Sequence, residues 1–333
     1  MDHHMNIKSR LSPIIPGLSI SIVIGFAAGF LSEHYGAPAM LFALLLGMSL
    51  NFIADDQRTI PGIAFSGRTL LRIGVALLGF RIVLGDILAL GARPIFLLFL
   101  AVLTTLLFGF LIARLAGLSK HFGALSGGAV GICGASAALA IAAILPKSEK
   151  QERETAFAVV GVTALSTMAM IIYPLISAAM EFSDVQAGVF IGATVHDVAQ
   201  VVGAGYSISD EAGDMATLFK LIRVALLLPV VIILSLLFRG DAEVGAERPP
   251  LLPGFLTAFV IITLVNSFIE IPAAVTDTMS NVSRQCLITA IAAIGLKTDM
   301  KSFLELGRMP VIILVAETIW LAAFVLVCLL LLS

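Results

Sequence analysis

Two glycine-rich stretches inside hydrophobic segments hold the residues of this chain whose types and spacing could do chemistry. They run over residues 126–136 and 192–205, and the second contains His196, Asp197 and Gln200. Glycine lowers helix propensity, and an ionisable side chain at bilayer depth costs about 2.5 kcal/mol or more. Both features together indicate interrupted helices beside a polar cavity, which is how many transporters build a substrate or ion site.

The stretch 192–205 offers titratable and hydrogen-bonding side chains on one helical turn. His196 and Gln200 are four residues apart and share a helix face, and Asp197 precedes Gln200 by three. Aspartate can hold a cation or a proton, and histidine titrates near neutral pH. A buried His–Asp pair that only fixes packing is the alternative. We predict ion coupling through Asp197 and His196, with Thr194 and Gln200 as substrate contacts.

The stretch 126–136 has two interpretations. Its glycines fit close helix packing of the small-xxx-small kind, as at Gly127 and Gly131. They also fit a broken helix, which would turn free N–H groups and the positive end of its dipole toward an anion. On the second interpretation, the predicted substrate contacts are Ser126, Gly127, Gly128, Gly131, Gly134 and Ser136.

Isolated polar residues occur in other hydrophobic segments. Asn51 and Asn266 each close an apolar segment, where helix capping and a site role are equal alternatives, and we include Asn266 among the predicted substrate contacts. Glu317 lies deep in the last segment. It is predicted either to pair with a basic residue such as Arg72 or to line the cavity.

Basic residues near helix ends have a simpler interpretation. Lys220 and Arg223 begin a hydrophobic segment, so we expect their long side chains to reach the membrane interface. Arg284 either balances a negative substrate or lies among the headgroups.

The composition identifies the class of protein. Hydrophobic residues make up 59% of the chain and charged residues 13%, against about 25% charged in soluble domains. A helix needs about 20 apolar residues to span a bilayer. We therefore predict an all-α polytopic membrane protein with 10–11 transmembrane helices, forming a single integral membrane domain over residues 1–333. The candidate segments are 13–32, 37–53, 67–84, 93–116, 121–146, 155–180, 184–206, 215–238, 252–271, 280–297 and 307–332.

Several functional classes are disfavoured by the sequence. The net charge is −2 with no basic patch, which argues against nucleic-acid binding. The three cysteines lie in hydrophobic segments without metal-site spacing. The sequence has no phosphate-binding loop after a strand, no paired metal-ligand motif and no nucleophile elbow. We predict no enzyme activity, hence no catalytic residue, no metal and no cofactor.

An internal repeat is visible at an offset of 216 residues. Residues 71–94 resemble 287–310, and at an offset of 215 Pro38 and Asn51 meet Pro253 and Asn266. The matched helices are seven apart, so they should run in opposite directions as inverted repeats. We expect repeat one over about 13–146, a linker helix at 155–180 and repeat two over about 184–332. The matched positions include Ala76, Gly79, Leu88, Leu90, Gly91 and Pro94 with Ala292, Gly295, Leu304, Leu306, Gly307 and Pro310.

The distribution of basic residues bears on orientation. With the N-terminus inside, twelve Lys and Arg residues fall on the cytoplasmic side and eight outside. The positive-inside rule favours that arrangement. The charged loop 146–155 would then lie outside, against the rule.

The residues of 126–140, Glu154–Ala158 and 192–205 resemble the bacterial YeiH-type sulfate exporter family, the UPF0324 membrane proteins. The resemblance covers the chain from about Pro16 to its C-terminus. It implies a bacterial cell membrane location and membership of the superfamily of bile acid symporters, auxin carriers and cation/proton antiporters. It further implies a panel and a core domain, crossing broken helices and elevator motion.

In that comparison the stretch 126–136 is similar in place to one crossing helix. The second crossing helix is either the segment 280–297 or the His196 segment. The chain's own repeat indicates that 126–136 and 192–205 are not symmetry mates.

The resulting hypothesis is a secondary active transporter that exports a small anion, namely sulfate, a sulfonate or a carboxylate. Coupling to H⁺ or Na⁺ would run through Asp197, with neighbouring backbone carbonyls holding the cation. One alternative is a cation/proton exchanger without an anion substrate, and another is a non-transporting subunit of a membrane complex. The lipid bilayer is an expected partner, and a homodimer remains open.

Overall fold

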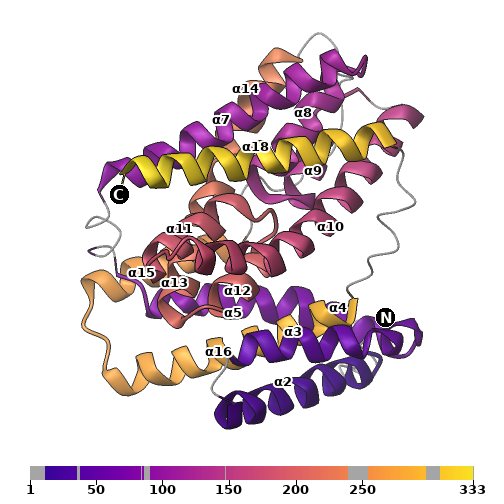
Figure 1. The fold of residues 1–333 in the computed structure, drawn as a ribbon. Coiled ribbons are helices and arrows are strands. Elements are labelled where there is room, and N and C mark those ends of the chain that lie inside the picture. The colour runs from indigo at the N-terminus through magenta and orange to yellow at the C-terminus, as the bar shows by residue number, and fades with distance from the viewer. Residues whose placement is uncertain are drawn as a thin grey trace, which may run out of the picture. The chain divides into compact units, whose positions relative to one another are not determined.

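The computed structural model describes residues 12–35, 38–83, 85, 91–146, 148–238, 254–297 and 308–332, which form helices joined by short turns, with no strand among them. The chain divides into two compact units, each built from separate parts of the sequence (Figure 1). Unit 1 comprises residues 1–87, 206–209 and 254–299. Unit 2 comprises residues 88–205, 210–253 and 300–333.

Six of the described helices are long and apolar enough to cross a membrane: Ile15–Tyr35, Ile60–Phe80, Ala92–Leu115, Glu149–Ala179, Asp210–Leu237 and Arg308–Leu331. Large apolar side chains lie on their outer surfaces; Phe26 and Phe30 are 70% and 68% exposed. Such surfaces are stable against lipid rather than water. The predicted all-α polytopic membrane class is confirmed. The other predicted spans correspond to two shorter apolar helices, two interrupted helices and the more polar helix 273–297.

Unit 1 contains α2 (Ile15–Tyr35), α3 (Ala39–Ser49), η1 (Asn51–Asp55), α4 (Ile60–Phe65), η2 (Ser66–Leu70), α5 (Leu71–Leu77), η3 (Leu78–Phe80), α15 (Gly254–Phe268) and α16 (Ala273–Lys297). Helix α16 packs against α2, α3 and α5. A Cβ on Gly47 of α3 would lie 2.9 Å from the Cα of Gly295 in α16, and the reverse distance is also 2.9 Å. Glycine at both positions lets the two backbones touch.

The internal repeat is visible in unit 1 as two helix caps. In each, an asparagine of one arm of the repeat caps a helix of the other arm. Asn51 Nδ2 donates to the Leu296 carbonyl at 2.8 Å, and Asn266 Nδ2 donates to the Phe80 carbonyl at 3.0 Å. Asn51 and Asn266 are repeat equivalents, and so are Phe80 and Leu296. Each asparagine therefore caps the end of a helix in the other arm, as a two-fold relation between the arms requires.

Close backbone contacts obey the same relation. A Cβ on Gly79 would lie 2.8 Å from the Phe259 carbonyl oxygen, and a Cβ on Gly295 would lie 2.5 Å from that of Leu44. Gly79 with Gly295, and Leu44 with Phe259, are repeat equivalents. The repeat predicted from sequence is thus present in the packing of unit 1. Its matches at Leu88, Leu90, Leu304, Leu306, Gly307 and Pro253 lie outside the described residues.

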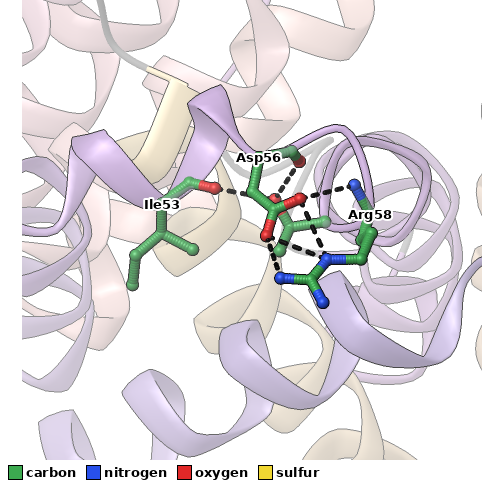
Figure 2. A network of polar contacts seen from close by, with 4 residues as sticks. Ile53, Asp56 and Arg58 are labelled. Carbon is green, nitrogen blue, oxygen red and sulfur yellow. Dashed lines mark hydrogen bonds and ion pairs between the residues drawn. The ribbon is translucent and has the colours of Figure 1, made fainter.

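A compact turn joins η1 to α4 (Figure 2). Arg58 Nη2 donates to Asp56 Oδ2 at 2.7 Å, and the Thr59 hydroxyl donates to the Ile53 carbonyl at 2.7 Å. The Arg58 side chain lowers the pKa of the Asp56 carboxyl by hydrogen bonding to it. The turn lets the chain reverse into the helix that spans residues 60–80.

Unit 2 contains α7 (Ala92–Leu115), α8 (Lys120–Gly128), η4 (Ala129–Cys133), α9 (Ala135–Ala142), α10 (Glu149–Ala179), α11 (Asp184–Thr194), α12 (Val198–Tyr206) up to Gly205, α13 (Asp210–Ala225), α14 (Leu227–Leu237) and α18 (Arg308–Leu332). The long helices α7 and α18 pack together, and α11 packs closely on α13 (Figure 1). Helix α11 begins with a capping box between Ser183 and Gln186. The two interrupted helices, α8–α9 and α11–α12, pack against these long helices.

Candidate functional site

The first break lies at Gly134. Helix α8 continues as the π-helical segment η4 to Cys133, and α9 starts again at Ala135. Gly134 has φ 64° and ψ −129°, a conformation that side-chain-bearing residues rarely adopt. The broken-helix interpretation of the stretch 126–136 is therefore correct, and the interruption is confined to one glycine.

The second break lies between α11 and α12. Helix α11 ends at Thr194, and Val195 is extended with φ −64° and ψ 137°. Asp197 Oδ1 then accepts from the Ala199 N–H at 2.9 Å, which caps the start of α12. The aspartate therefore has a structural role at the point where the helix resumes.

The two breaks meet inside unit 2. A Cβ on Gly134 would lie 3.4 Å from the carbonyl oxygen of His196 and 3.6 Å from its Cβ. The other candidate for the second crossing helix, residues 280–297, belongs to the uninterrupted α16 of unit 1. The internal repeat predicted that the stretches 126–136 and 192–205 are not symmetry mates. It relates α3, α5 and α7 to α15, α16 and α18, and both broken helices lie between those arms in sequence.

Lys220 of α13 is fully buried where the breaks meet. Its Nζ donates to the carbonyls of Ile132 at 2.7 Å and Val195 at 3.0 Å, and also to the carbonyl of His196. Three carbonyl acceptors require three N–H donors, so the geometry is that of a charged ammonium group. The expectation that this lysine reaches the membrane interface is wrong.

Arg223, one turn further along α13, is also fully buried. Its guanidinium donates to the carbonyls of Gly131 at 2.8 Å and Val130 at 2.9 Å in the first broken helix. It also donates to the carbonyls of Val195 at 3.1 Å and Gly192 at 3.3 Å in the second. Its predicted interfacial position is wrong as well, because these backbone groups need donors inside the protein.

The two cations together satisfy the C-terminal carbonyls that a helix leaves unpaired. They also face the negative ends of two helix dipoles. Sequence reasoning missed this role. The available signal was the three-residue spacing of Lys220 and Arg223, which places them on one face of a helix that follows both breaks in sequence.

Glu317 of α18 is fully buried. Its Oε1 accepts from the Ser126 hydroxyl at 2.8 Å, so its partner is a serine of α8 rather than a basic residue. Arg72, the basic partner considered from sequence, lies in unit 1 with an exposed side chain. Pairing of Glu317 with Arg72 is therefore not found, and the alternative that Glu317 lines the cavity stays a prediction.

His196 is fully buried and contacts the next residue of α18. Its Nε2 lies 3.0 Å from the Thr318 hydroxyl, which itself donates to the Leu314 carbonyl at 2.7 Å. The hydroxyl must therefore accept from His196, which assigns the ring proton to Nε2. The other ring nitrogen, Nδ1, is buried without a partner in the described part of the chain.

Helix α10 supplies hydroxyl groups to the second break. The Asp197 N–H donates to Ser166 Oγ at 3.0 Å, and Gln200 Nε2 lies 3.5 Å from Thr167 Oγ1. Gln200 Oε1 is buried and has no partner among the described residues. The polar side chains predicted in this stretch therefore contact hydroxyl groups of α10 and α18. Two of their acceptors, Gln200 Oε1 and His196 Nδ1, have no hydrogen-bond partner among the described residues.

The remaining predicted contacts are dispersed. Gly127 packs against the backbone of Thr105 in α7, so close packing and the break occur in the same stretch. Gly131 also faces α7, and Gly128 faces Ile141 of α9. Thr194 is buried and donates to the Phe190 carbonyl, whereas Ser136 is exposed in the first turn of α9. Asn266 serves as a helix cap in unit 1, apart from these residues of unit 2.

Comparison with known proteins places the chain in a family. Residues 16–314 match the family model described as Conserved hypothetical protein 698. The UPF0324 membrane protein CT0845 of Chlorobaculum tepidum is 52% identical over 96% of this chain and 90% of its own length. The UPF0324 membrane protein TauZ of Paracoccus denitrificans is 51% identical, with 96% and 95% covered. The UPF0324 inner membrane protein YeiH of Escherichia coli is 34% identical, with 92% and 91% covered.

Among solved structures, a sodium proton antiporter from Methanocaldococcus jannaschii matches with 14% identity and a TM-score of 0.32, covering 96% of this chain and 99% of that one. That likeness is too low to carry an argument. The predicted multi-pass location in a bacterial inner membrane is confirmed by the relatives and the apolar helices. The chain belongs to the UPF0324 family of membrane proteins.

Proposed function

We propose that this chain is a secondary active transporter that exports a small anion, with its substrate site where the two broken helices meet. The observation that carries the proposal is the position of Lys220 and Arg223. Two cations are buried side by side on α13, and they hold the carbonyl ends of both broken helices. A membrane protein that only needed stable helices would leave the helices unbroken and the cations at the surface.

The charge of the region favours an anion over a cation. Lys220 and Arg223 both donate to backbone carbonyls, and Asp197, at the second break, is the neighbouring carboxylate. Two positive charges and one negative charge leave one positive charge in excess. An anion that enters the break would be attracted by that charge, whereas a metal cation would be repelled.

The backbone offers matching donors. Helices α9 and α12 both begin at the breaks, so the positive ends of their dipoles and first-turn N–H groups other than that of Ala199, which donates to Asp197, are candidate contacts for an anion. The hydroxyl of Ser136 is exposed in the first turn of α9. Sulfate, sulfonates and carboxylates all present the oxygen acceptors that such donors bind.

The coupling ion needs a different place from the one expected. Backbone carbonyls beside Asp197 were predicted to hold a cation, yet Lys220 and Arg223 already occupy carbonyls of both breaks. The protein therefore supplies its own cations at that point. Elevator motion, which the family resemblance implies, stays part of the proposal.

Uptake into proteoliposomes tests the proposal. Purified protein would be reconstituted, and ³⁵S-sulfate uptake measured with an imposed pH gradient and with an imposed Na⁺ gradient. We expect protein-dependent uptake that unlabelled sulfate, methanesulfonate or acetate reduces by competition. Protein-free liposomes are the control.

Two results would contradict anion transport. The first is a folded, monodisperse protein that takes up none of these anions under either gradient. The second is a pH change on adding Na⁺ alone, without any anion, which would favour the cation/proton exchanger.

A further inference from the structure

The acid Glu317 is buried in unit 2, and only one of its two carboxyl oxygens has a hydrogen-bond partner among the described residues. Its exposure is 0%, and Ser126 donates to Oε1 at 2.8 Å. Oε2 has no hydrogen-bond partner in the part of the chain that the structure describes. The anion site proposed above uses neither oxygen.

The packing makes room for this carboxyl group. A Cβ on Gly109 of α7 would lie 2.8 Å from Glu317 Oε1 and 2.8 Å from the Gly123 carbonyl oxygen. It would also lie 2.8 Å from Gly127 Cα. Any larger residue at position 109 would displace the acid or separate α7 from α8. The carboxyl group is therefore accommodated by the close contact of two helices.

The groups that face Glu317 are neutral. Helix α18 packs against α7, α8, η4, α10 and α11. From these elements the Ser126 hydroxyl reaches the carboxyl group. Their other Asp, Glu, Lys, Arg and His residues lie in the first two turns or the last turn of each helix. Away from the helix ends, η4 contributes the buried thiol of Cys133 and α10 contributes Tyr173, which packs on Phe190.

A carboxylate with one hydroxyl donor and no cation is unstable at such depth. An ionised acid inside a bilayer costs at least about 2.5 kcal/mol, and burial without compensation costs more. Lys220 and Arg223 donate to backbone carbonyls rather than to Glu317, so neither forms an ion pair with its carboxyl group. The resting form of Glu317 in this arrangement is the neutral acid, with its proton on Oε2.

Helix α18 connects the acid to both breaks. Glu317 contacts Ser126 of the first broken helix, and the next residue, Thr318, contacts His196 of the second. A change of charge on Glu317 would therefore act on both helices at once. Nδ1 of that histidine is buried and has no hydrogen-bond partner among the described residues.

We propose that Glu317 is the proton-binding group of this protein and that H⁺ is the coupling ion. A proton from water on one side of the membrane adds to Oε2 and forms the neutral acid. Its release to water on the other side restores the carboxylate, and no further reactant takes part. The coupling role rests on the transport proposed above, whereas the proton binding does not.

The assignment differs from the one made from sequence. Asp197 is only part-buried, its Oδ1 accepts from the Ala199 N–H, and its own N–H is held by Ser166. Glu317 has fewer partners, and the neutral form of its carboxyl group is the one that its surroundings favour.

Infrared difference spectroscopy of the purified protein tests proton binding without any substrate. A pH jump should produce the C=O band of a buried carboxylic acid in the wild type. The band should be lost in Glu317→Gln, which keeps an acceptor for Ser126 but cannot titrate, and return shifted in Glu317→Asp. The control, Glu152→Gln, removes an exposed acid of α10 and should leave the band unchanged. A band that persists in Glu317→Gln would overturn the proposal.

Transport assays then test coupling. In Glu317→Gln, ³⁵S-sulfate uptake driven by a pH gradient should fall at least tenfold, while exchange of labelled for unlabelled sulfate should continue. Exchange shows that the variant is folded and binds anion. Gradient-driven uptake at the wild-type rate would overturn the coupling role. If the wild type moves no sulfate, the anion proposal fails, and the infrared result still decides whether Glu317 binds a proton.

Discussion

At the residue scale, the centre of unit 2 depends on how Lys220 and Arg223 satisfy buried carbonyls. Replacing Lys220 by methionine keeps the volume of the side chain but removes every N–H donor. The carbonyls of Ile132 and His196 would lose the donor that the structure gives them, and each buried unsatisfied acceptor costs about 1–3 kcal/mol. We expect Lys220→Met to lower the free energy of unfolding in detergent by about 3 kcal/mol or more.

The matched control for that experiment is Lys150→Met. The Lys150 side chain is 66% exposed, and its Nζ lies 3.8 Å from Glu154. Exposed pairs of this kind contribute about 0–1 kcal/mol. Denaturation followed by circular dichroism would compare the two variants. Equal midpoints for Lys220→Met and Lys150→Met would show that the carbonyls at the breaks do not need the lysine.

At the element scale, the first break depends on one backbone conformation. Gly134→Ala would force a side-chain-bearing residue to φ 64°, which costs about 1–3 kcal/mol. The new methyl group would meet His196 at ordinary contact distances, the nearest being 3.4 Å, so strain rather than collision is the cause. We expect a lower unfolding midpoint together with reduced sulfate uptake.

A second glycine variant separates strain from helix propensity. Gly29 lies within α2, and an added Cβ would meet nothing within 4 Å. Gly29→Ala should therefore be neutral or stabilise the protein by up to about 1 kcal/mol. If Gly134→Ala is as stable as Gly29→Ala, the junction of α8 and α9 does not need a residue that adopts the positive φ of Gly134.

The reciprocal caps of unit 1 give a second prediction at this scale. Asn51→Leu and Asn266→Leu each remove the amide donor to a helix-terminal carbonyl, of Leu296 and Phe80 respectively. We expect similar losses of about 1–3 kcal/mol, because the two sites are repeat equivalents. The exposed Asn281, replaced by leucine, should change stability by less than about 0.5 kcal/mol. Losses that differ severalfold between the two caps would argue against a two-fold arrangement.

At the scale of the whole molecule, the sequence predicted the membrane class, the spans, the repeat and both interrupted helices. These features follow from local composition, hydrophobic length and glycine content. It left open whether the two interruptions meet, because either 280–297 or the His196 segment could be the second crossing helix and no local pattern relates α8 to α11. The burial of Lys220 and Arg223 was missed for a related reason. A basic residue near a helix end normally reaches the interface, and only the carbonyls of distant segments hold these two inside.

The burial of Lys220 and Arg223 strengthens the argument for one orientation of the protein in the membrane. Of the eight basic residues assigned to the outer side when the N-terminus is inside, Lys220 and Arg223 are now inside unit 2. Six then remain outside against twelve on the cytoplasmic side, so the positive-inside bias becomes twofold. We predict a cytoplasmic N-terminus and, with eleven crossings, a C-terminus on the outer face.

Fusion proteins in bacterial cells measure this directly. Alkaline phosphatase joined to the C-terminus should be active, because it folds only outside the cytoplasm, and green fluorescent protein at the same end should stay dark. Green fluorescent protein at the N-terminus should fluoresce. The reverse pattern would assign the charged loop 146–155 to the cytoplasm and would place the starts of α10 and α13 on that side. Both tags on the same side would show an even number of crossings, so that one of the interrupted or short helices does not span.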